Sequence, residues 1–428
     1  MPFAAFRVRS FRFQWPADLL TSWAFEMETL ILSWYVMVQT GSVLLLTAFG
    51  ALQLLGTLAA PMFGVLSDRL GVRVMLCSMR ATYAVAAALV MGLALASALT
   101  PAWVLVITTV VGLVRPSDLV MRNSLIGETI PRQHLMNALG LSRATMDSAR
   151  VAGALSGAAL SASLGIGRAY TVVTLCYLAS LALTRGVSRG RPVPDPGAPR
   201  DAIATPIAAP RSSRWRDVGD VLLHVATSPA VLATMLLAFL VNLSAYPVSS
   251  GLLPYVAREV YGVDATGLGW LAASFPFGAL LGSMVMVTTG GSRQPQRSML
   301  VNIVLWYVAL LGFAVAPTMR MGMLALAVAG FVQSLGMIAM TATLLADAGD
   351  GFRGRIMGVR MLAVYGMPLG LLGAGALITR LGYSLTVTLY CVIGLAATAV
   401  IATRWRASMW RRESVGHPAA ASAPQRVS

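Results

Sequence analysis

Long apolar stretches, separated by short polar segments, run along most of this chain of 428 residues. A helix needs about 20 mostly apolar residues to cross a bilayer, and twelve stretches reach that length. Several are separated only by a tight turn, such as Thr40-Gly41-Ser42, so consecutive helices are expected to pair as antiparallel hairpins. The predicted spans are residues 17–38, 43–66, 74–97, 101–124, 136–163, 168–185, 229–257, 266–289, 298–317, 321–346, 356–379 and 382–402.

One long polar segment, residues 186–228, divides the spans into two sets of six. Its first part is rich in Pro, Gly and charge, which is typical of a disordered linker. Its second part places Trp215, Val218, Leu222 and Val225 at helical spacing, which indicates an amphipathic helix on the membrane surface. The predicted organisation is an N-terminal six-helix bundle at residues 1–185, this cytoplasmic linker, a C-terminal six-helix bundle at 229–403 and a disordered cytoplasmic tail at 404–428.

Two sets of six spans in the same order indicate two parallel repeats, an arrangement in which a substrate site forms between the repeats near the bilayer midplane. The predicted fold is therefore an all-α membrane protein with 12 transmembrane helices in two pseudo-symmetric six-helix bundles. Composition agrees, because 57% of the residues are hydrophobic and 11% are charged, against roughly 25% charged in an ordinary soluble domain. Cys77, Cys176 and Cys391 lie in or beside apolar runs without metal-site spacing, so neither a metal nor a cofactor is expected.

The 32 basic residues are all arginines, and the net charge is +16. They lie mostly at the ends of apolar runs and form no recognition element, which argues against nucleic acid binding. Cytoplasmic loops carry the excess of Arg in membrane proteins. If the N- and C-termini are cytoplasmic, most of the arginines lie on the inner side of the membrane, such as Arg7, Arg9, Arg293 and Arg404. The chain is therefore predicted to be a multi-pass inner-membrane protein with both termini in the cytoplasm. The N-terminus has no small-residue cleavage site, so the first helix is expected to be retained.

A conspicuous motif stands between spans 2 and 3: Gly64-Val-Leu-Ser-Asp68-Arg69-Leu-Gly71-Val-Arg73. Glycine allows two helix ends to approach closely, and an Asp can cap the next helix or pair with a basic residue. The motif resembles the loop 2–3 signature of the major facilitator superfamily, G-x-L-x-D-R-x-G-x-R. The resemblance implies a cytoplasmic gate at this loop.

Further segments resemble the exporter group of that superfamily that includes the enterobactin exporter. They include Phe11-Arg12, Trp34-Tyr35 and Arg353-Gly354-Arg355. The resemblance implies export of small molecules, siderophores or drugs, often against proton entry. The chain has Gly153-Ala154 where the span-5 antiporter motif has Gly-Pro, and the ladder Ala149, Gly153, Gly157 still permits close helix packing.

Ionisable residues inside spans are costly and suggest function. Span 1 carries Glu26 and Glu28, and Glu26 shares a polar helix face with Ser22, Thr29 and Ser33. Glu26, with Glu28 as a second candidate, is therefore predicted to face the central cavity as a proton or cation site. The alternative is an ion pair that locks span 1 to a neighbouring helix.

Spans 4 and 5 each carry a charged triplet on one helix face: Arg115, Asp118 and Arg122 in span 4, and Arg143, Asp147 and Arg150 in span 5. The triplets can simply pair within themselves and join the two spans, or they can form ion pairs that break and re-form as a gate. Arg115 and Arg150 lie deeper than the others and are candidates to contact substrate or an acid of span 1. The candidate gating residues are Gly64, Asp68, Arg69, Gly71, Arg73, Asp118, Arg122, Arg143, Asp147, Arg353 and Arg355.

The leading interpretation is a secondary transporter, a monomer in the lipid bilayer, that exports drug- or siderophore-like small molecules by alternating access, with protons as the coupling ion. Uptake or lipid transport on the same fold is an alternative, as is a sensor that does not transport. No GxSxG, HExxH or phosphate-binding glycine loop is present, so an enzyme is not expected.

Overall fold

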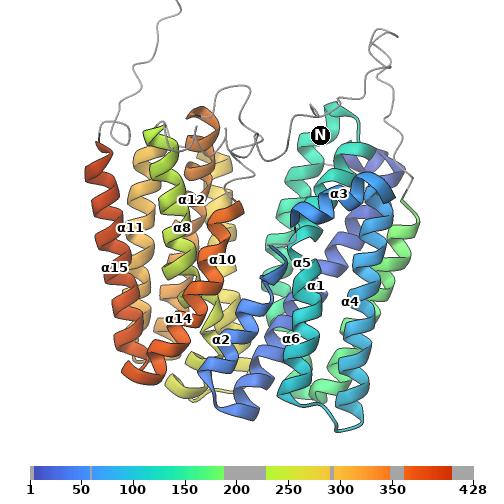
Figure 1. Ribbon diagram of the computed structural model, residues 1–428, viewed down its shortest axis with the longest axis horizontal. Helices are drawn as coiled ribbons and strands as arrows, with labels where there is room; N and C mark the ends of the chain where they lie inside the picture. Colours follow the sequence, from blue (N-terminus) through green and yellow to red (C-terminus); the bar gives the residue numbers. More distant parts are fainter. Residues whose placement is uncertain (1–3, 58–59, 188–227, 290–293, 348–360, 407–428) are drawn as a thin grey trace, which may run out of the picture.

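The computed structural model describes residues 4–57, 60–187, 228–289, 294–347 and 361–406, and all regular structure in these ranges is helical. The helices form two bundles that stand side by side (Figure 1). The N-terminal bundle contains α1 (Arg9–Thr40), α2 (Val43–Leu52), α3 (Ala60–Leu70), α4 (Val72–Leu95), α5 (Pro101–Thr129) and α6 (Arg132–Arg185). The C-terminal bundle contains α8 (Pro229–Tyr246), α9 (Leu253–Tyr255), α10 (Ala265–Thr289), α11 (Pro295–Ala314), α12 (Met319–Asp347), α14 (Gly366–Leu381) and α15 (Tyr383–Arg404).

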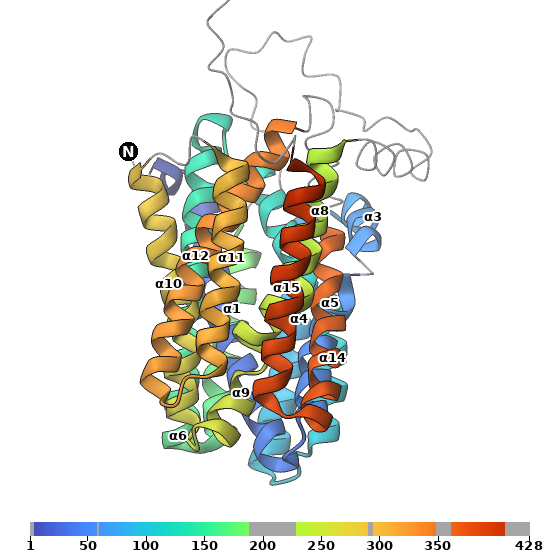
Figure 2. The same cartoon turned by 90° about the vertical axis from the view of Figure 1, so that its left-hand side faces the viewer.

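Helix α1 begins, α6 ends, α8 begins and α15 ends at the same end of the molecule, which we name the terminal end (Figures 1 and 2). The opposite end, the hairpin end, carries the tight turns. Gly41, Gly165 and Gly382 make three of these turns with φ of 60°, 74° and 78°. Glycine adopts this left-handed conformation without the steric cost that other residues meet. The turns predicted from the sequence therefore rest on residues suited to them.

The predicted all-α fold is confirmed, with two differences in detail. Nine described helices are long and apolar enough to cross a membrane, and one of them, Ala138–Arg185, covers most of predicted span 5 and all of predicted span 6, joined at Gly165. Predicted span 2, residues 43–66, is wrong as a single helix. It is divided into α2, the 3₁₀ turn η2 (Leu55–Thr57) and α3. The predicted linker helix at 215–225 and the tail beyond residue 406 lie outside the described residues.

Exposed apolar side chains cover the outer faces of the bundles. On α11, Val301, Val304, Leu305 and Val308 are between 37% and 53% exposed and recur at helical spacing. A soluble protein rarely exposes a large contiguous apolar face. Together with the length of the helices, these faces identify a multi-pass membrane protein.

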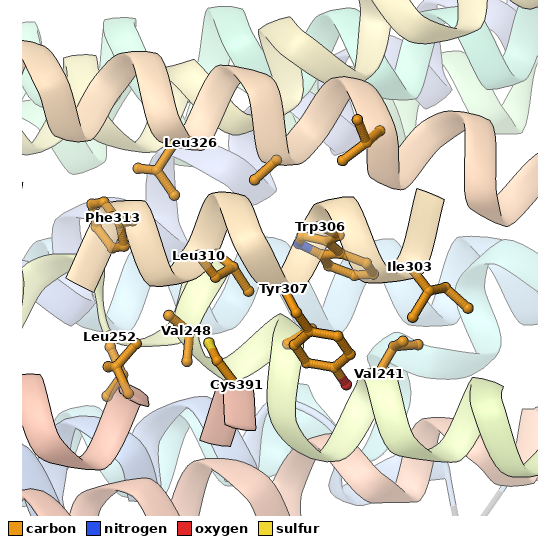
Figure 3. Packing of buried hydrophobic residues seen from close by; sticks show 14 of the residues in the cluster. Val241, Val248, Leu252, Ile303, Trp306, Tyr307, Leu310, Phe313, Leu326 and Cys391 are labelled. Atoms are coloured by element: carbon orange, nitrogen blue, oxygen red, sulfur yellow. The ribbon is translucent and has the colours of Figure 1, made fainter. Parts of the chain in front are cut away.

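Each bundle has its own apolar core. In the C-terminal bundle, Trp306, Tyr307, Leu310 and Phe313 of α11 pack between α8 and α12 (Figure 3). The polar ends of the large rings find partners, since Trp306 Nε1 donates to Ser249 Oγ at 3.2 Å and the Tyr307 hydroxyl lies 2.7 Å from Ser244 Oγ. Buried Trp and Tyr usually need such partners. Helix η4, a π-helical turn at Pro247–Gly251, carries Ser249.

The two bundles touch near the hairpin end. Gly269 of α10 lies so close to Ala158 of α6 that an added Cβ would overlap the alanine, and Gly375 of α14 approaches Thr47 of α2 equally closely. Arg258 Nη1 donates to the backbone carbonyl oxygen of Met37 at the end of α1. Small residues at these crossings let the helix backbones come together.

Candidate functional site

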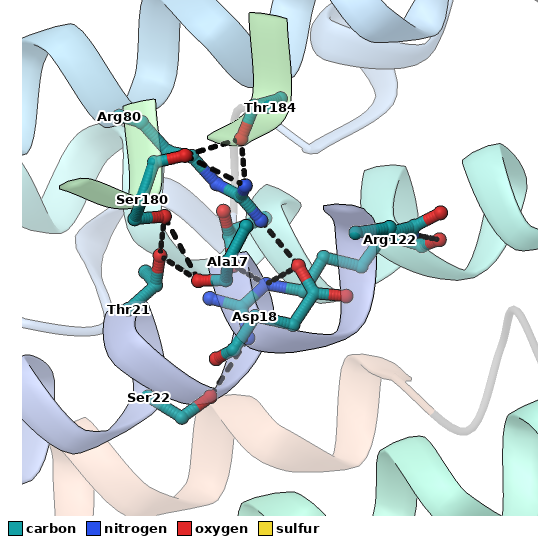
Figure 4. A network of polar contacts seen from close by, with 10 residues as sticks. Ala17, Asp18, Thr21, Ser22, Arg80, Arg122, Ser180 and Thr184 are labelled. Carbon is teal, nitrogen blue, oxygen red and sulfur yellow. Dashed lines mark hydrogen bonds and ion pairs between the residues drawn. The ribbon is translucent and has the colours of Figure 1, made fainter. Parts of the chain in front are cut away.

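A buried ion network joins three helices of the N-terminal bundle near the terminal end (Figure 4). Asp18 of α1 pairs with Arg80 of α4, and its Oδ1 lies 3.7 Å from Nε of Arg122 on α5. Arg122 also pairs with Asp118, one turn earlier on α5. The four side chains are at most 9% exposed. Two carboxylates and two guanidinium groups balance in charge, which is what ions buried in a membrane protein require.

Neutral groups complete the network. Arg122 Nη1 donates to Ser22 Oγ at 2.8 Å and to the Asp18 carbonyl oxygen at 3.3 Å. Arg80 Nη1 donates to the hydroxyl of Thr184 near the end of α6. The network thus ties α1, α4, α5 and α6 to one another, and all of its partners belong to the N-terminal bundle.

Sequence reasoning found part of this network. Asp118 and Arg122 were predicted to pair, and they do. Neither Asp18, an acid in the apolar start of span 1, nor Arg80 of span 3 is among the site residues predicted from the sequence. The signal that could have found both is an ionisable residue within a span. As predicted gating residues, Asp118 and Arg122 lie inside one bundle and not between the bundles.

The charged triplet of span 5 faces α1. Asp147 lies between Arg143 Nε at 3.2 Å and Arg150 Nη1 at 3.6 Å, as the spacing predicted. Arg150 Nε also lies 3.7 Å from Oε1 of Glu26. The side chains of Arg143 and Arg150 are 65% and 46% exposed, and that of Glu26 is 26% exposed. This cluster is therefore open to solvent, unlike the network around Asp18.

Glu28 has a different environment from Glu26. Its side chain is buried, and its Oε2 accepts a hydrogen bond of 2.8 Å from the Tyr177 hydroxyl on the second half of α6. Glu28 also lines a small pocket with Thr29, Gln53 and Arg115. The two acids of span 1, two residues apart, therefore point to different sides of α1, as helical geometry predicts.

Arg115 has only neutral oxygens as hydrogen-bond partners in the described part of the chain. Its Nη1 donates to Gln53 Oε1 at 2.8 Å, and its Nη2 donates to Thr29 Oγ1 at 3.2 Å and to the Phe25 carbonyl oxygen at 3.4 Å. Its guanidinium also lies against the Phe25 ring. Arg115 takes no part in the ion pair of its own helix, because Asp118 faces Arg122 on the next turn.

Two glycines of α6 allow α1 to approach. A Cβ added at Gly153 would lie 2.5 Å from Glu26 Cβ, and one added at Gly157 would lie 2.9 Å from Met27 Cα. Either distance is far shorter than a van der Waals contact. The glycines therefore set how closely Glu26 can sit to Arg150 on the neighbouring turn of α6.

The motif between spans 2 and 3 is partly described. Gly71 has φ +87°, and its N–H donates to the Ser67 carbonyl oxygen at 2.8 Å, so it makes the turn from α3 into α4. Arg73 donates to the Arg185 carbonyl oxygen at the end of α6, where helix carbonyls lack intrahelical partners. Arg69 is exposed. The predicted gating residues Arg353 and Arg355 and the side chain of Asp68 lie outside the described residues, and Gly64 falls within α3.

In the described ranges, no group of three or more His, Cys, Asp or Glu side chains is arranged to hold a metal ion. Cys77, Cys176 and Cys391 are free thiols. The side chains that the two clusters bring together carry carboxylates, guanidinium groups and hydroxyls.

Comparison with known proteins bears on the fold. The comparison with curated proteins gave no match. Among solved structures, a bacterial homologue of the human lysosomal transporter Spinster, in an inward-facing and unoccupied conformation, has a TM-score of 0.68 at 14% sequence identity, with 94% of this chain and 97% of that chain covered. The POT family transporter PepTSo has a TM-score of 0.71 at 13% identity, covering 94% and 99%. A D-xylose–proton symporter has a TM-score of 0.66 at 15% identity, covering 91% and 97%.

Identities this low show a shared fold and do not indicate a shared substrate. The sequence family is shown separately, because the model of the Major Facilitator Superfamily matches residues 17–365, which is most of the chain and ends just before α14. The chain belongs to the Major Facilitator Superfamily.

Proposed function

We propose that this protein is a secondary transporter that exports small molecules by alternating access and admits protons in exchange. The observation that carries the proposal is the contrast between two acids of α1. Glu28 is buried and bonded to the neutral hydroxyl of Tyr177, whereas Glu26 is partly exposed and faces Arg150. Acids inside a membrane protein are costly, so each is expected to have a task.

Glu28 is suited to bind and release the transported proton. The Tyr177 hydroxyl can donate to a carboxylate and can accept from a carboxylic acid, so this hydrogen bond survives both protonation states. A salt bridge would instead be lost on protonation. With the same hydroxyl as its partner in both forms, Glu28 can hold a proton in one state of the transport cycle and release it in another.

Glu26 and Arg150 are suited to bind the substrate. Their 3.7 Å separation is longer than a hydrogen bond, and both side chains reach solvent. A cationic group of a substrate can replace Arg150 at Glu26, and Arg150 can remain paired with Asp147, 3.6 Å away. Cationic or neutral amphipathic molecules are therefore the favoured substrates, with drug- or siderophore-like compounds implied by the resemblance to exporters.

The contacts between the bundles support the mechanism. They lie near the hairpin end, at Gly269 with Ala158, and at Arg258 with Met37. Opening them while the terminal end closes would expose the site to the other side of the membrane. In this scheme the terminal end faces the cytoplasm of the cell membrane, where the arginines gather, and the gating residues of the Gly64–Arg73 motif, with Arg143, Asp147, Arg353 and Arg355, act there. The transporter works as a monomer.

Proteoliposomes with an imposed pH gradient test the proposal. The probes are lipophilic cations and catechol siderophores, and the variants are Glu28→Gln and Glu26→Gln. The proposal expects a compound whose movement follows the pH gradient in the wild type and no longer follows it in Glu28→Gln. Transport that ignores the gradient in the wild type would remove antiport and leave a facilitator on the same fold.

A further inference from the structure

Glu28 and Arg115 line the same small pocket between α1, α2 and α5, yet their hydrogen bonds go elsewhere. Glu28 is bonded by Tyr177, and Arg115 is bonded by Gln53, Thr29 and the Phe25 carbonyl oxygen. Opposite charges in a medium of low dielectric attract strongly. Something must therefore hold the guanidinium away from the carboxylate.

Gln53 is in a position to do so because span 2 is broken. Helix α2 ends at Leu52, and Gln53 is its C-cap residue, where the chain turns before η2. The Gln53 Oε1 accepts the shortest hydrogen bond from Arg115, at 2.8 Å, and the Thr29 hydroxyl lies 3.4 Å from the same oxygen. Gln53 and Thr29 thus form one neutral cradle for the cation.

Two glycines hold the break in span 2 beside Arg115. An added Cβ at Gly56 of η2 would overlap the Leu113 carbonyl oxygen of α5, and one at Gly112 would overlap the Leu52 carbonyl oxygen. The broken segment therefore lies directly on α5 beside Arg115. In a continuous helix through residues 43–66, Gln53 would lie in a regular helical turn. Leu52 and Gly56, on either side of Gln53, would then not both contact α5 so closely.

We propose that Gln53 is a positioning residue for proton exchange, which holds Arg115 away from Glu28 so that Glu28 stays available to a proton. The proposal rests on the proposed function of Glu28. The groups that face Glu28 are Arg115 from α5 and the hydroxyls of Tyr177 and Tyr170 from α6. Of these, only Arg115 carries a charge at neutral pH, so its position decides how easily Glu28 is protonated.

Replacement of Gln53 is expected to make Glu28 harder to protonate. Without the Gln53 acceptor, Arg115 loses a partner and swings toward Glu28, the acid that lines the same pocket. A cation beside the carboxylate of Glu28 favours its ionised form, so a lower pH is needed to protonate it. The pH at which substrate-coupled proton flux is half-maximal then falls by about one unit or more.

The experiment compares three variants with the wild type in proteoliposomes. Gln53→Leu removes the acceptor at similar volume, and the proposal expects the half-maximal pH to fall. Gln53→Glu keeps an oxygen at Arg115 and adds a charge, so the half-maximal pH is expected to stay at or above the wild-type value. Gln333→Leu removes a glutamine bonded to Tyr246 in the other bundle and controls for the loss of an amide in the membrane; its profile is expected to coincide with the wild type.

The results distinguish failure of the proposed function from failure of the role assigned to Gln53. A wild type without proton-coupled transport contradicts the proposed function itself. A coupled wild type whose pH profile coincides with that of Gln53→Leu overturns only the role of Gln53. If Gln53→Leu does not fold, Gln53→Glu decides, because a lower half-maximal pH in that variant contradicts the proposal.

Discussion

Asp18 and Arg80 are 62 residues apart in the sequence and form an ion pair whose arginine side chain is fully buried. The pair joins α1 to α4, and Arg122 adds α5 to the same group. Removing one partner of a buried pair leaves an uncompensated charge. This pair is therefore expected to matter far more for stability than the exposed pairs of the bundle.

Asp18→Asn is expected to destabilise the protein by about 3–5 kcal/mol, because the buried Arg80 then loses the carboxylate with which it pairs. Arg143→Ala is the matched control, since it also breaks an Arg–Asp pair, but with an arginine side chain that is 65% exposed. Such exposed pairs contribute about 0–1 kcal/mol. Thermal unfolding in detergent measures both, and equal melting temperatures for the two variants would contradict the account.

Gly269→Leu is expected to force the bundles apart at the hairpin end, since Ala158 leaves no room for a side chain. Overpacking costs about 1–3 kcal/mol and would shift the conformational equilibrium by about 5- to 150-fold. Spin labels at the exposed positions Ser163 and Thr266 report the separation of α6 and α10.

Gly312→Leu is the control for that experiment. Gly312 lies on α11 with no atom within 4 Å of an added Cβ, so its replacement should leave the label distance unchanged. A label distance in Gly269→Leu that matches both the control and the wild type would show that this crossing does not hold the bundles together.

Glu26→Gln and Glu28→Gln are expected to differ in kind. The partly exposed Glu26 contacts Arg150, so its replacement should weaken the binding of cationic substrates and preserve the dependence on the pH gradient. Glu28 is buried against Tyr177, so its replacement should remove that dependence while substrate binding persists. Binding titrations and gradient-driven transport on both variants test this, and an exchange of the two phenotypes would assign the roles the other way round.

The sequence predicted the helices well because hydropathy and tight turns are local properties. The glycines at residues 41, 165 and 382 mark their turns, and long apolar runs mark the helices. The break in span 2 was missed because it depends on a crossing with α5 at Gly56 and Gly112, which no pattern within span 2 reveals. The residues around the break are as apolar as those of an unbroken helix.

The candidate site was predicted in part for the same reason. Charges inside spans identified Glu26, Glu28, Arg115 and Arg150, since an ionisable residue in an apolar run is visible in the sequence. Their partners come from distant parts of the chain, as with Tyr177, which is 149 residues from Glu28. Helical periodicity predicts pairs within one helix, so it found Asp147 with its arginines, but it could not show that Arg115 bonds to Gln53 in another span.

The most direct measurement of the central claim is proton release on substrate binding. Purified protein in weakly buffered detergent solution is mixed with a transported compound, and a pH indicator follows the protons. Exchange of substrate for a proton at Glu28 predicts that the wild type releases protons, that Glu26→Gln does so at higher substrate concentration, and that Glu28→Gln releases none. Binding of the compound without proton release by the wild type, or undiminished release by Glu28→Gln, would contradict the account.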